Sequence, residues 1–165
     1  TQAAVRRALL GLYDTSPDGY PGNDDLGTLS SWYVFGALGL YPEVPGVGLL
    51  AIGSPLFPRA EIRLPQRRRA TILASAREVT RSGVGKKRRR QVRPLSPAAA
   101  PYVQSLRLNG HAYAKPWTTY CGLARGATLS FSLGRHPNRA WGAAAAAAPP
   151  SFGPRRPMPK GDCTP

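Results

Sequence analysis

Apolar residues recur at helical spacing over the first forty positions of the chain. Val5, Leu9 and Tyr13 lie four positions apart, which predicts an amphipathic helix over residues 2–13. Over residues 26–40, apolar side chains cover more than one face of a helix, so we expect a second helix that is buried. The chain therefore opens with two helices that pack against other parts of a protein.

A polar turn precedes the second helix, and proline follows it. Asp24 or Asp25 is well placed as the N-cap, because a carboxylate oxygen can accept a hydrogen bond from a free amide of the first turn. Gly39 and then Tyr41-Pro42 end the helix.

Beyond residue 46 the period changes from that of a helix to that of strands. Asn109-Gly110 predicts a hairpin, because a type I′ turn needs positive φ at both central residues. Helices followed by a run of strands indicate the α+β class. The expected strands are residues 49–53, 60–64, 70–74, 102–108, 111–114 and 127–133.

The charge of the chain is concentrated in one segment. The 165 residues carry a formal net charge of +15, and residues 66–94 alone contain eleven basic residues and one acid, Glu78. Such a block repels itself, so we expect residues 66–99 to be a disordered basic insertion. The Ala- and Pro-rich residues 143–165 have low complexity and predict a disordered tail.

A basic run can bind polyanions, because each Lys or Arg placed on a phosphate releases counterions. However, no aromatic residue lies between Gln66 and Pro101, so a platform for stacking bases is missing. We therefore do not expect nucleic-acid binding to be the main function. Cys121 and Cys163 form no metal-ligand pattern, and both a disulfide and two free thiols stay open.

No apolar stretch reaches the roughly 20 residues of a membrane helix, so no membrane span is expected. The first residue is Thr1, and no signal peptide opens the sequence. We expect the start to be internal to a longer protein.

Several short blocks of the sequence form a recognisable series. The blocks are Pro21-Gly22-Asn23-Asp24-Asp25-Leu26-Gly27, Ser31-Trp32-Tyr33-Val34-Phe35, Ala37-Leu38-Gly39-Leu40-Tyr41-Pro42, Pro45-Gly46, Gly53-Ser54-Pro55-Leu56-Phe57, Leu106 and Leu108-Asn109-Gly110, Lys115-Pro116-Trp117, and Pro137-Asn138-Arg139-Ala140-Trp141-Gly142. In this order they resemble glycoside hydrolase family 92, the calcium-dependent exo-acting α-mannosidases. The resemblance covers residues 1–65 and 100–142 and fails over 66–99 and in the tail.

The resemblance implies a division of the chain. Residues 1–46 would be the C-terminal end of an (α/α)6 catalytic toroid. Residues 47–142 would be antiparallel β-sandwich strands, interrupted by the basic insertion 66–99. Residues 143–165 would be the disordered tail.

The resemblance also implies inverting hydrolysis of terminal α-mannose, which needs a carboxylic acid and a second carboxylate that activates water. Asp25 falls on the position that resembles the general base, and Asp24 flanks it. Gly22 and Asn23 resemble residues that bind substrate. The competing interpretation is that the aspartates only cap a helix and Asn23 only makes a turn.

Calcium is implied as the cofactor, with Asn23 and Asp25 as candidate ligands. Calcium takes six to eight oxygens, so this turn alone is an incomplete shell. The general acid of the family is a Glu upstream of these blocks, and Glu43, Glu61 and Glu78 do not occupy its motif.

The sequence therefore predicts a fragment of a secreted α-mannosidase, acting on α-1,2-linked mannose in glycans, with the general base but not the general acid. Alone it should be nearly inactive. The alternatives are an inactive truncated product, a β-sandwich module that contacts carbohydrate, and a polyanion-binding protein that acts through its basic segment. The oligomeric state is left open.

Overall fold

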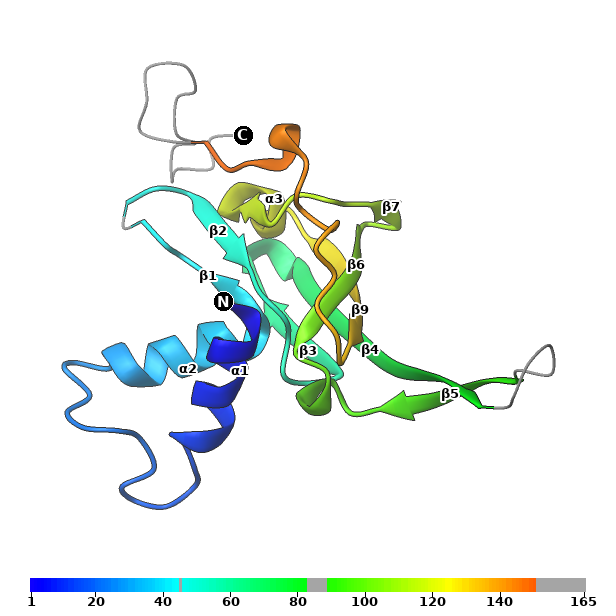
Figure 1. Ribbon diagram of the computed structural model, residues 1–165. Helices are drawn as coiled ribbons and strands as arrows, with labels where there is room; N and C mark the ends of the chain where they lie inside the picture. Colours follow the sequence, from blue (N-terminus) through cyan, green and yellow to red (C-terminus); the bar gives the residue numbers. More distant parts are fainter. Residues whose placement is uncertain (45, 83–88, 151–165) are drawn as a thin grey trace.

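Helices precede two β-sheets in the computed structural model, which describes residues 1–44, 46–82 and 89–150 (Figure 1). The predicted helices are confirmed: α1 spans Gln2–Gly11 and α2 spans Thr28–Leu38. A short helix, α3, spans Tyr120–Ala124 and contains Cys121, whereas Cys163 lies outside the described residues. No helix in the described part of the chain is long and apolar enough to cross a membrane.

The strands form a small sheet and a large one. The small sheet has the order β1-β2-β8, and the large sheet has the order β3-β4-β9-β6-β7 with β5 paired to β4. The bounds are β1 Leu40–Tyr41, β2 Leu49–Ile52, β3 Arg59–Arg63, β4 Arg69–Ser82, β5 Arg89–Leu95, β6 Tyr102–Leu108, β7 His111–Ala112, β8 Trp117–Thr119 and β9 Ala127–Gly134. The hairpin at Asn109-Gly110 is confirmed, with φ angles of 50° and 83°.

One hydrophobic core joins the two sheets. Alternate residues of β9 are buried, as its sequence pattern predicts. Leu129, Phe131 and Leu133 lie in the same cluster as Leu50 and Ile52 of the small sheet. The two sheets therefore stabilise each other through their facing side chains.

The expectation of antiparallel strands throughout is wrong for the centre of the large sheet. β4 and β9 run parallel, with Ala70 opposite Ala127 and Ala76 opposite Leu133. A parallel pair needs a long connection, and residues between the two strands supply it by forming β5, β6, β7, β8 and α3.

The expectation of a disordered basic insertion is also wrong for its described residues. Ala70, Ile72, Ala74 and Ala76 alternate into the core, which makes β4 a central strand despite its charge. Beyond Ala76, β4 pairs with β5 as a two-stranded ribbon that extends away from the sheets in Figure 1. Backbone hydrogen bonds hold this ribbon, so its side chains can remain charged and solvated. Residues 83–88 lie outside the described part.

The sequence predicts a disordered tail over residues 143–165, and this prediction is wrong for residues 143–150. A 3-10 turn at Ala145–Ala147 packs against the body of the protein, and Ala147 is buried. The indole Nε1 of Trp117 donates a hydrogen bond of 3.0 Å to the carbonyl oxygen of Ala147. Small alanine side chains allow this close approach. Residues 151–165 lie outside the described part.

The prediction that the second helix is buried holds for one side only. Gly36 and Ala37 are buried, but Val34 keeps 54% of its surface exposed. The side chain of Leu9 in α1 packs on Gly36, where an added Cβ would lie 3.2 Å from a methyl carbon of Leu9. Leu38 packs against the core and Tyr13 stacks on Trp32, so the exposed apolar surface of α2 is centred on Val34 among the described residues.

A buried arginine attaches α1 to the sheets. Arg6 is only 4% exposed. Its guanidinium donates hydrogen bonds to the carbonyl oxygens of Pro97, Ser54 and Pro55 at 2.8, 3.0 and 2.8 Å, and to the hydroxyl of Ser54 at 2.6 Å. Burial lowers the pKa of Arg6 to about 10, so the side chain remains charged at neutral pH.

Replacing Arg6 with Met should lower the free energy of unfolding by about 2–4 kcal/mol, because three buried carbonyl groups lose charged donors. The measurement is urea unfolding followed by circular dichroism. Arg7→Met is the matched control, since Arg7 is exposed on the same helix and should change stability by less than about 0.5 kcal/mol. Equal losses in the two variants would contradict the anchoring role of Arg6.

Candidate active-site turn

The Gly22–Gly27 segment makes an unusual turn into α2. Asp25, Leu26 and Gly27 have φ angles of 44°, 62° and 91°, so three consecutive residues adopt the left-handed conformation. This conformation is uncommon for residues other than glycine, and for a bulky residue it marks strain that the surroundings must hold. Leu26 is fully exposed at this turn. The backbone geometry thus sets this segment apart from an ordinary helix start.

Asp24 holds the turn in place. Its carboxylate oxygens accept hydrogen bonds from the amide of Ser30 at 2.9 Å and from the hydroxyl of Ser30 at 2.8 Å. Its carbonyl oxygen accepts from the amide of Thr28 at 2.7 Å. The N-cap position itself is occupied by Gly27, so Asp24 caps the helix from three residues earlier.

These hydrogen bonds also fix the charge of Asp24. The amide and then the hydroxyl of Ser30 lower the pKa of the carboxyl group below 3.8. Asp24 is therefore ionised at neutral pH, and both of its oxygens are used within the chain.

Asp25 differs from Asp24 in having a free carboxylate. Its side chain is exposed and has no hydrogen-bond or ion-pair partner among the described residues. Only its backbone is held, by a hydrogen bond of 2.8 Å from the hydroxyl of Thr28 to its carbonyl oxygen. Gly22 and Asn23 are exposed on the same turn, and Gly22 has a φ angle of 82°. The structure thus brings together the four residues that the sequence selects.

An aromatic cluster packs Tyr13, which precedes the turn, against α2, which follows it. The ring of Tyr13 stacks on Trp32 at 5.8 Å between centroids and tilts against Tyr33 at 5.0 Å. Its hydroxyl donates to the carbonyl oxygen of Leu29 at 3.2 Å. Burial, and then the charge of Asp24, raise the pKa of Tyr13. Sequence reasoning gave Tyr13 only a packing role, although its position one turn after Leu9 places it beside α2.

The turn offers few ligands for a metal ion. Asn23 and Asp25 bring one amide oxygen and one carboxylate, while Asp24 is engaged with Ser30. Across the residues the structure describes, no cluster of three or more His, Cys, Asp or Glu side chains could hold a metal. Because calcium takes six to eight oxygens, these residues alone do not fit a complete calcium site.

The glutamates do not supply an obvious general acid. Glu61 forms ion pairs with Arg59 and Arg69, both at 3.0 Å, and the hydrogen bond from Arg59 lowers its pKa first, followed by the charge of Arg69. Glu78 pairs with Arg135 at 3.2 Å. A general acid must hold a proton at neutral pH, which the lowered pKa of Glu61 opposes. Glu43 is exposed and lies after β1.

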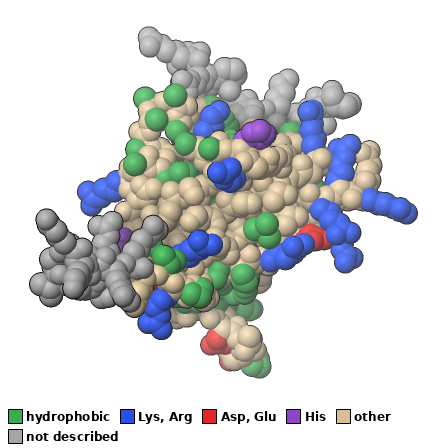
Figure 2. All heavy atoms as spheres, turned by 90° about the vertical axis from the view of Figure 1, so that its right-hand side faces the viewer, with side chains coloured by type: hydrophobic (Ala, Val, Ile, Leu, Met, Phe, Trp, Pro, Cys, Tyr) green, Lys and Arg blue, Asp and Glu red, His purple; other side chains and the backbone are tan. Residues whose placement is uncertain are grey.

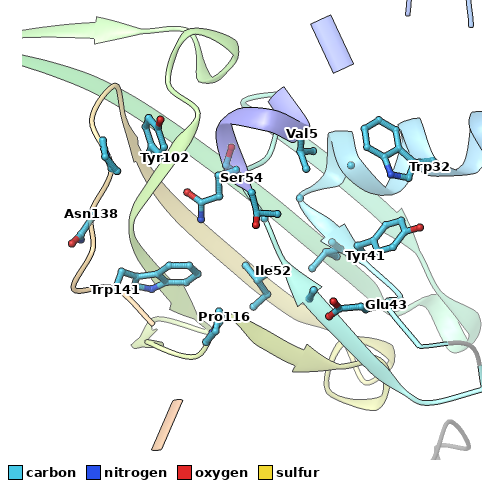
Figure 3. A pocket seen from close by; sticks show the side chains of 18 residues that line it. Val5, Trp32, Tyr41, Glu43, Ile52, Ser54, Tyr102, Pro116, Asn138 and Trp141 are labelled. Carbon is cyan, nitrogen blue, oxygen red and sulfur yellow. The ribbon is translucent and has the colours of Figure 1, made fainter. Parts of the chain in front are cut away.

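A cavity lies between the helices and the sheets (Figure 3). Its volume is about 600 Å³, within the range of small-molecule sites. Trp32, Glu43, Tyr102 and Trp141 are among its lining residues in Figure 3, and residues 22–25 do not line it.

Some polar groups around this cavity have partners in the chain, and others have none among the described residues. Ser54 bonds to Arg6, Gln2 accepts from the amide of Val103, and the amide of Asn138 donates to the carbonyl of Gln104. The polar side chains that line the cavity without a hydrogen bond to another described residue are Thr1, Trp32, Tyr41, Glu43 and Tyr102. Polar groups that orient a ligand must be free to bind it. The cavity therefore keeps free polar and aromatic groups, and the interpretation of the chain as a carbohydrate-contact module stays open.

A smaller hollow of about 260 Å³ adjoins the turn. Leu26, Gly27, Thr28, Trp32 and Tyr41 are among its lining residues. It is more open than the larger cavity and lies along the exposed side of α2. The apolar surface of α2 thus continues up to the candidate site.

Comparison with known proteins identifies the class. Residues 1–135 match the glycosyl hydrolase family 92 catalytic domain. The chain belongs to glycosyl hydrolase family 92.

Individual relatives agree with this assignment. An uncharacterized secreted glycosidase from Arthroderma benhamiae is 29% identical over 86% of this chain. A family 92 α-mannosidase from Bacteroides thetaiotaomicron, solved in complex with mannoimidazole, is 29% identical over 92% of this chain with a TM-score of 0.76. A family 92 inverting mannosidase from the same organism is 31% identical over 92% of this chain with a TM-score of 0.73.

The match covers only a small part of these relatives. The chain spans 16% of the Arthroderma protein and 17% and 18% of the two Bacteroides proteins. The family is one of glycoside hydrolases, and the chain corresponds to less than a fifth of such an enzyme.

Replacing Asp24 with Asn should lower the urea midpoint of unfolding at pH 7, because a carboxylate that accepts two hydrogen bonds is lost. The pKa of Asp24 is lowered by folding, so its contribution is present above pH 3.8 and disappears as the pH falls through the lowered value. The difference between the variant and the unchanged chain should therefore shrink below about pH 4. Asp25→Asn is the control and should leave the midpoint unchanged at each pH. A pH-independent effect of Asp24→Asn would contradict this assignment.

Proposed function

We propose that this chain is the part of a secreted, inverting α-mannosidase that carries the general base, with Asp25 as that base. The observation that supports the proposal is the exposed, unpartnered carboxylate of Asp25 in the turn that resembles the family motif. A base must have a free oxygen that can accept a proton from water, and Asp25 alone of the two adjacent aspartates has one.

In the proposed reaction, Asp25 accepts a proton from a water molecule as the water oxygen attacks the anomeric carbon of a terminal α-mannose residue. The bond to the leaving sugar oxygen breaks, and a carboxylic acid on the opposite side protonates that oxygen. Glu61 and Glu78 are ion-paired and unsuited to this role. The acid would come from polypeptide outside these 165 residues.

The roles of the neighbouring residues follow from their contacts. Asp24, which bonds to Ser30, would hold the left-handed backbone of Asp25 so that its carboxylate faces the water. Gly22 and Asn23 would approach the sugar, since both are exposed on the same turn. We assign the α-1,2 linkage on resemblance alone.

We also propose that α1 and α2 are the last helices of an (α/α)6 toroid and that the two sheets belong to a β-sandwich. The exposed apolar surface of α2, including Val34, supports this proposal because such a surface is normally covered. Further helices of the toroid would cover it.

The proposed base is tested in a chimaera. Residues 1–135 replace the matching segment of the full-length inverting mannosidase that is 31% identical to this chain. The chimaera should release mannose from aryl α-mannosides and from α-1,2-mannobiose, with the β-anomer formed first in proton NMR spectra. Asp25→Asn should lower kcat by roughly 10²–10⁴ with little change in KM, because the base acts in the chemical step.

Asp18→Asn is the matched control in the same chimaera, since Asp18 is an exposed aspartate outside the turn. It should leave kcat unchanged. Full activity of the Asp25→Asn chimaera would sink the proposed role. Formation of the α-anomer first would contradict inversion.

For the cofactor, we propose that Asn23 and Asp25 supply part of a calcium shell that sugar hydroxyls, water and other polypeptide complete. The chain alone should bind calcium only weakly, with a dissociation constant in the millimolar range typical of sparse sites. Isothermal titration of the chimaera should give tighter binding, which Asn23→Ala weakens. Equal calcium affinity of the chain and the chimaera would show that the shell is not shared in this way.

A further inference from the structure

The large sheet has an open face on the side opposite the core. Because side chains alternate along a strand, the residues that do not enter the core share this face. Figure 2 looks at the side from which the β4–β5 ribbon extends, and the charged side chains in this view are mostly Lys and Arg. We call this open face of the sheet the arginine face, defined by Arg59, Glu61, Arg63, Arg69, Thr71, Leu73, Ser75, Arg77, Ser105, Arg107, Thr128, Ser130 and Ser132.

Hydroxyl groups occupy the centre of the arginine face. Thr71 of β4 lies opposite Thr128 of β9, and Ser75 lies opposite Ser132. Ser105 of β6 also lies opposite Ser132, across the other edge of β9. Strands lie about 4.8 Å apart, so these residues form a polar strip over β4, β9 and β6, which Leu73, opposite Ser130, interrupts on β4.

Arginines flank this strip on both sides. Arg63 of β3 lies directly opposite Arg69 of β4, and Arg107 of β6 lies opposite Ser130. Arg77 continues the β4 row towards the ribbon. All four side chains are exposed, and Arg69 keeps 65% of its side-chain surface.

The acids on this face do not neutralise it. Glu61 forms ion pairs with Arg59 and Arg69 and also interacts with the charge of Arg63, whereas Arg77 and Arg107 form no ion pair among the described residues. Like charges directly opposite on neighbouring strands destabilise a sheet, as at Arg63 and Arg69. An anion bound between them would relieve that repulsion.

We propose that the arginine face binds an anionic polysaccharide that carries sulfate or carboxylate groups. Guanidinium groups bind such anions through paired N–H donors, and Ser and Thr hydroxyls donate to and accept from sugar hydroxyls. The defined face has no aromatic ring, so it lacks the stacking surface that single-stranded nucleic acids use. The proposal does not depend on Asp25 or on hydrolysis.

The test measures binding of the 165-residue chain to heparin, which carries sulfates, and to alginate, which carries carboxylates only. Neutral mannan and a single-stranded oligonucleotide are the comparison ligands. The variant combines Arg63→Gln, Arg69→Gln and Arg77→Gln. The control combines Arg7→Gln, Lys115→Gln and Arg139→Gln, which removes the same charge from exposed residues outside the large sheet.

The face variant should reduce the slope of log affinity for heparin against log salt by about 2–3, whereas the control should reduce it by less than about 1. The basic run at residues 86–90 is present in both variants and cancels from the comparison. Unchanged thermal midpoints by circular dichroism show that both variants fold. Binding of heparin alone assigns sulfate as the recognised group, and binding of alginate as well extends it to carboxylates.

Equal slopes for the two variants would overturn the proposal, because net charge rather than the arginine face would then account for binding. Tighter binding of the oligonucleotide than of heparin at the same salt concentration would also overturn it. Binding of neutral mannan with equal affinity would show that the anionic groups are not recognised.

Discussion

The position of α1 depends on one buried guanidinium. Arg6 donates to Ser54 and Pro55, which follow β2, and to Pro97, which follows β5. A charge is costly to bury unless hydrogen bonds satisfy it. Here backbone carbonyls and the Ser54 hydroxyl satisfy the terminal nitrogens without a carboxylate, while Nε has no hydrogen-bond partner among the described residues. The arrangement therefore ties a helix to two distant loops by directed bonds, where apolar contacts alone would allow sliding.

The candidate site is placed by α2, which is held at two points. Leu9 of α1 packs on Gly36 of α2, and Tyr13 stacks on Trp32. The carbonyl oxygens of Ala37 and Gly39 accept hydrogen bonds from amides of the loop after β2. Within the turn, the carboxylate of Asp24 bonds to Ser30 of the helix, and the side chain of Asp25 is exposed to solvent. Two neighbouring carboxylates thus differ in role because one of them meets Ser30. The proposed reaction uses this difference.

Much of the fold follows from local pattern. The helices, the Asn109-Gly110 hairpin and the alternation of β9 could be predicted because neighbouring residues determine them. The order of the strands could not, since β4 joins the centre of the sheet through partners far away in sequence. The charge of residues 66–94 indicated disorder, but the buried row from Ala70 to Ala76 outweighs it. The apolar residues of α2 predicted a buried helix, but the sequence pattern does not show which elements cover each side of the helix.

The candidate residues of the turn were found through motif resemblance and not through spacing. Asp24 and Asp25 look alike in sequence, and only the path of the backbone separates them. Tyr13 lacked any signal of its contact with Trp32 beyond its place after Leu9. The burial of Arg6 could not be predicted from the sequence, because an arginine in an amphipathic helix normally faces solvent.

The parallel pairing of β4 with β9 also constrains how the chain reaches this structure. Ala70 of β4 pairs with Ala127 of β9, and Arg6 donates a hydrogen bond to a residue 91 positions away. Contacts between distant residues slow folding, since a long loop must close before they form. On a ribosome, the centre of the large sheet stays incomplete until nearly all of the described residues have emerged. During that interval one edge of β4 lacks the backbone hydrogen-bond partner that β9 later supplies, and an unpaired strand edge can pair with another chain.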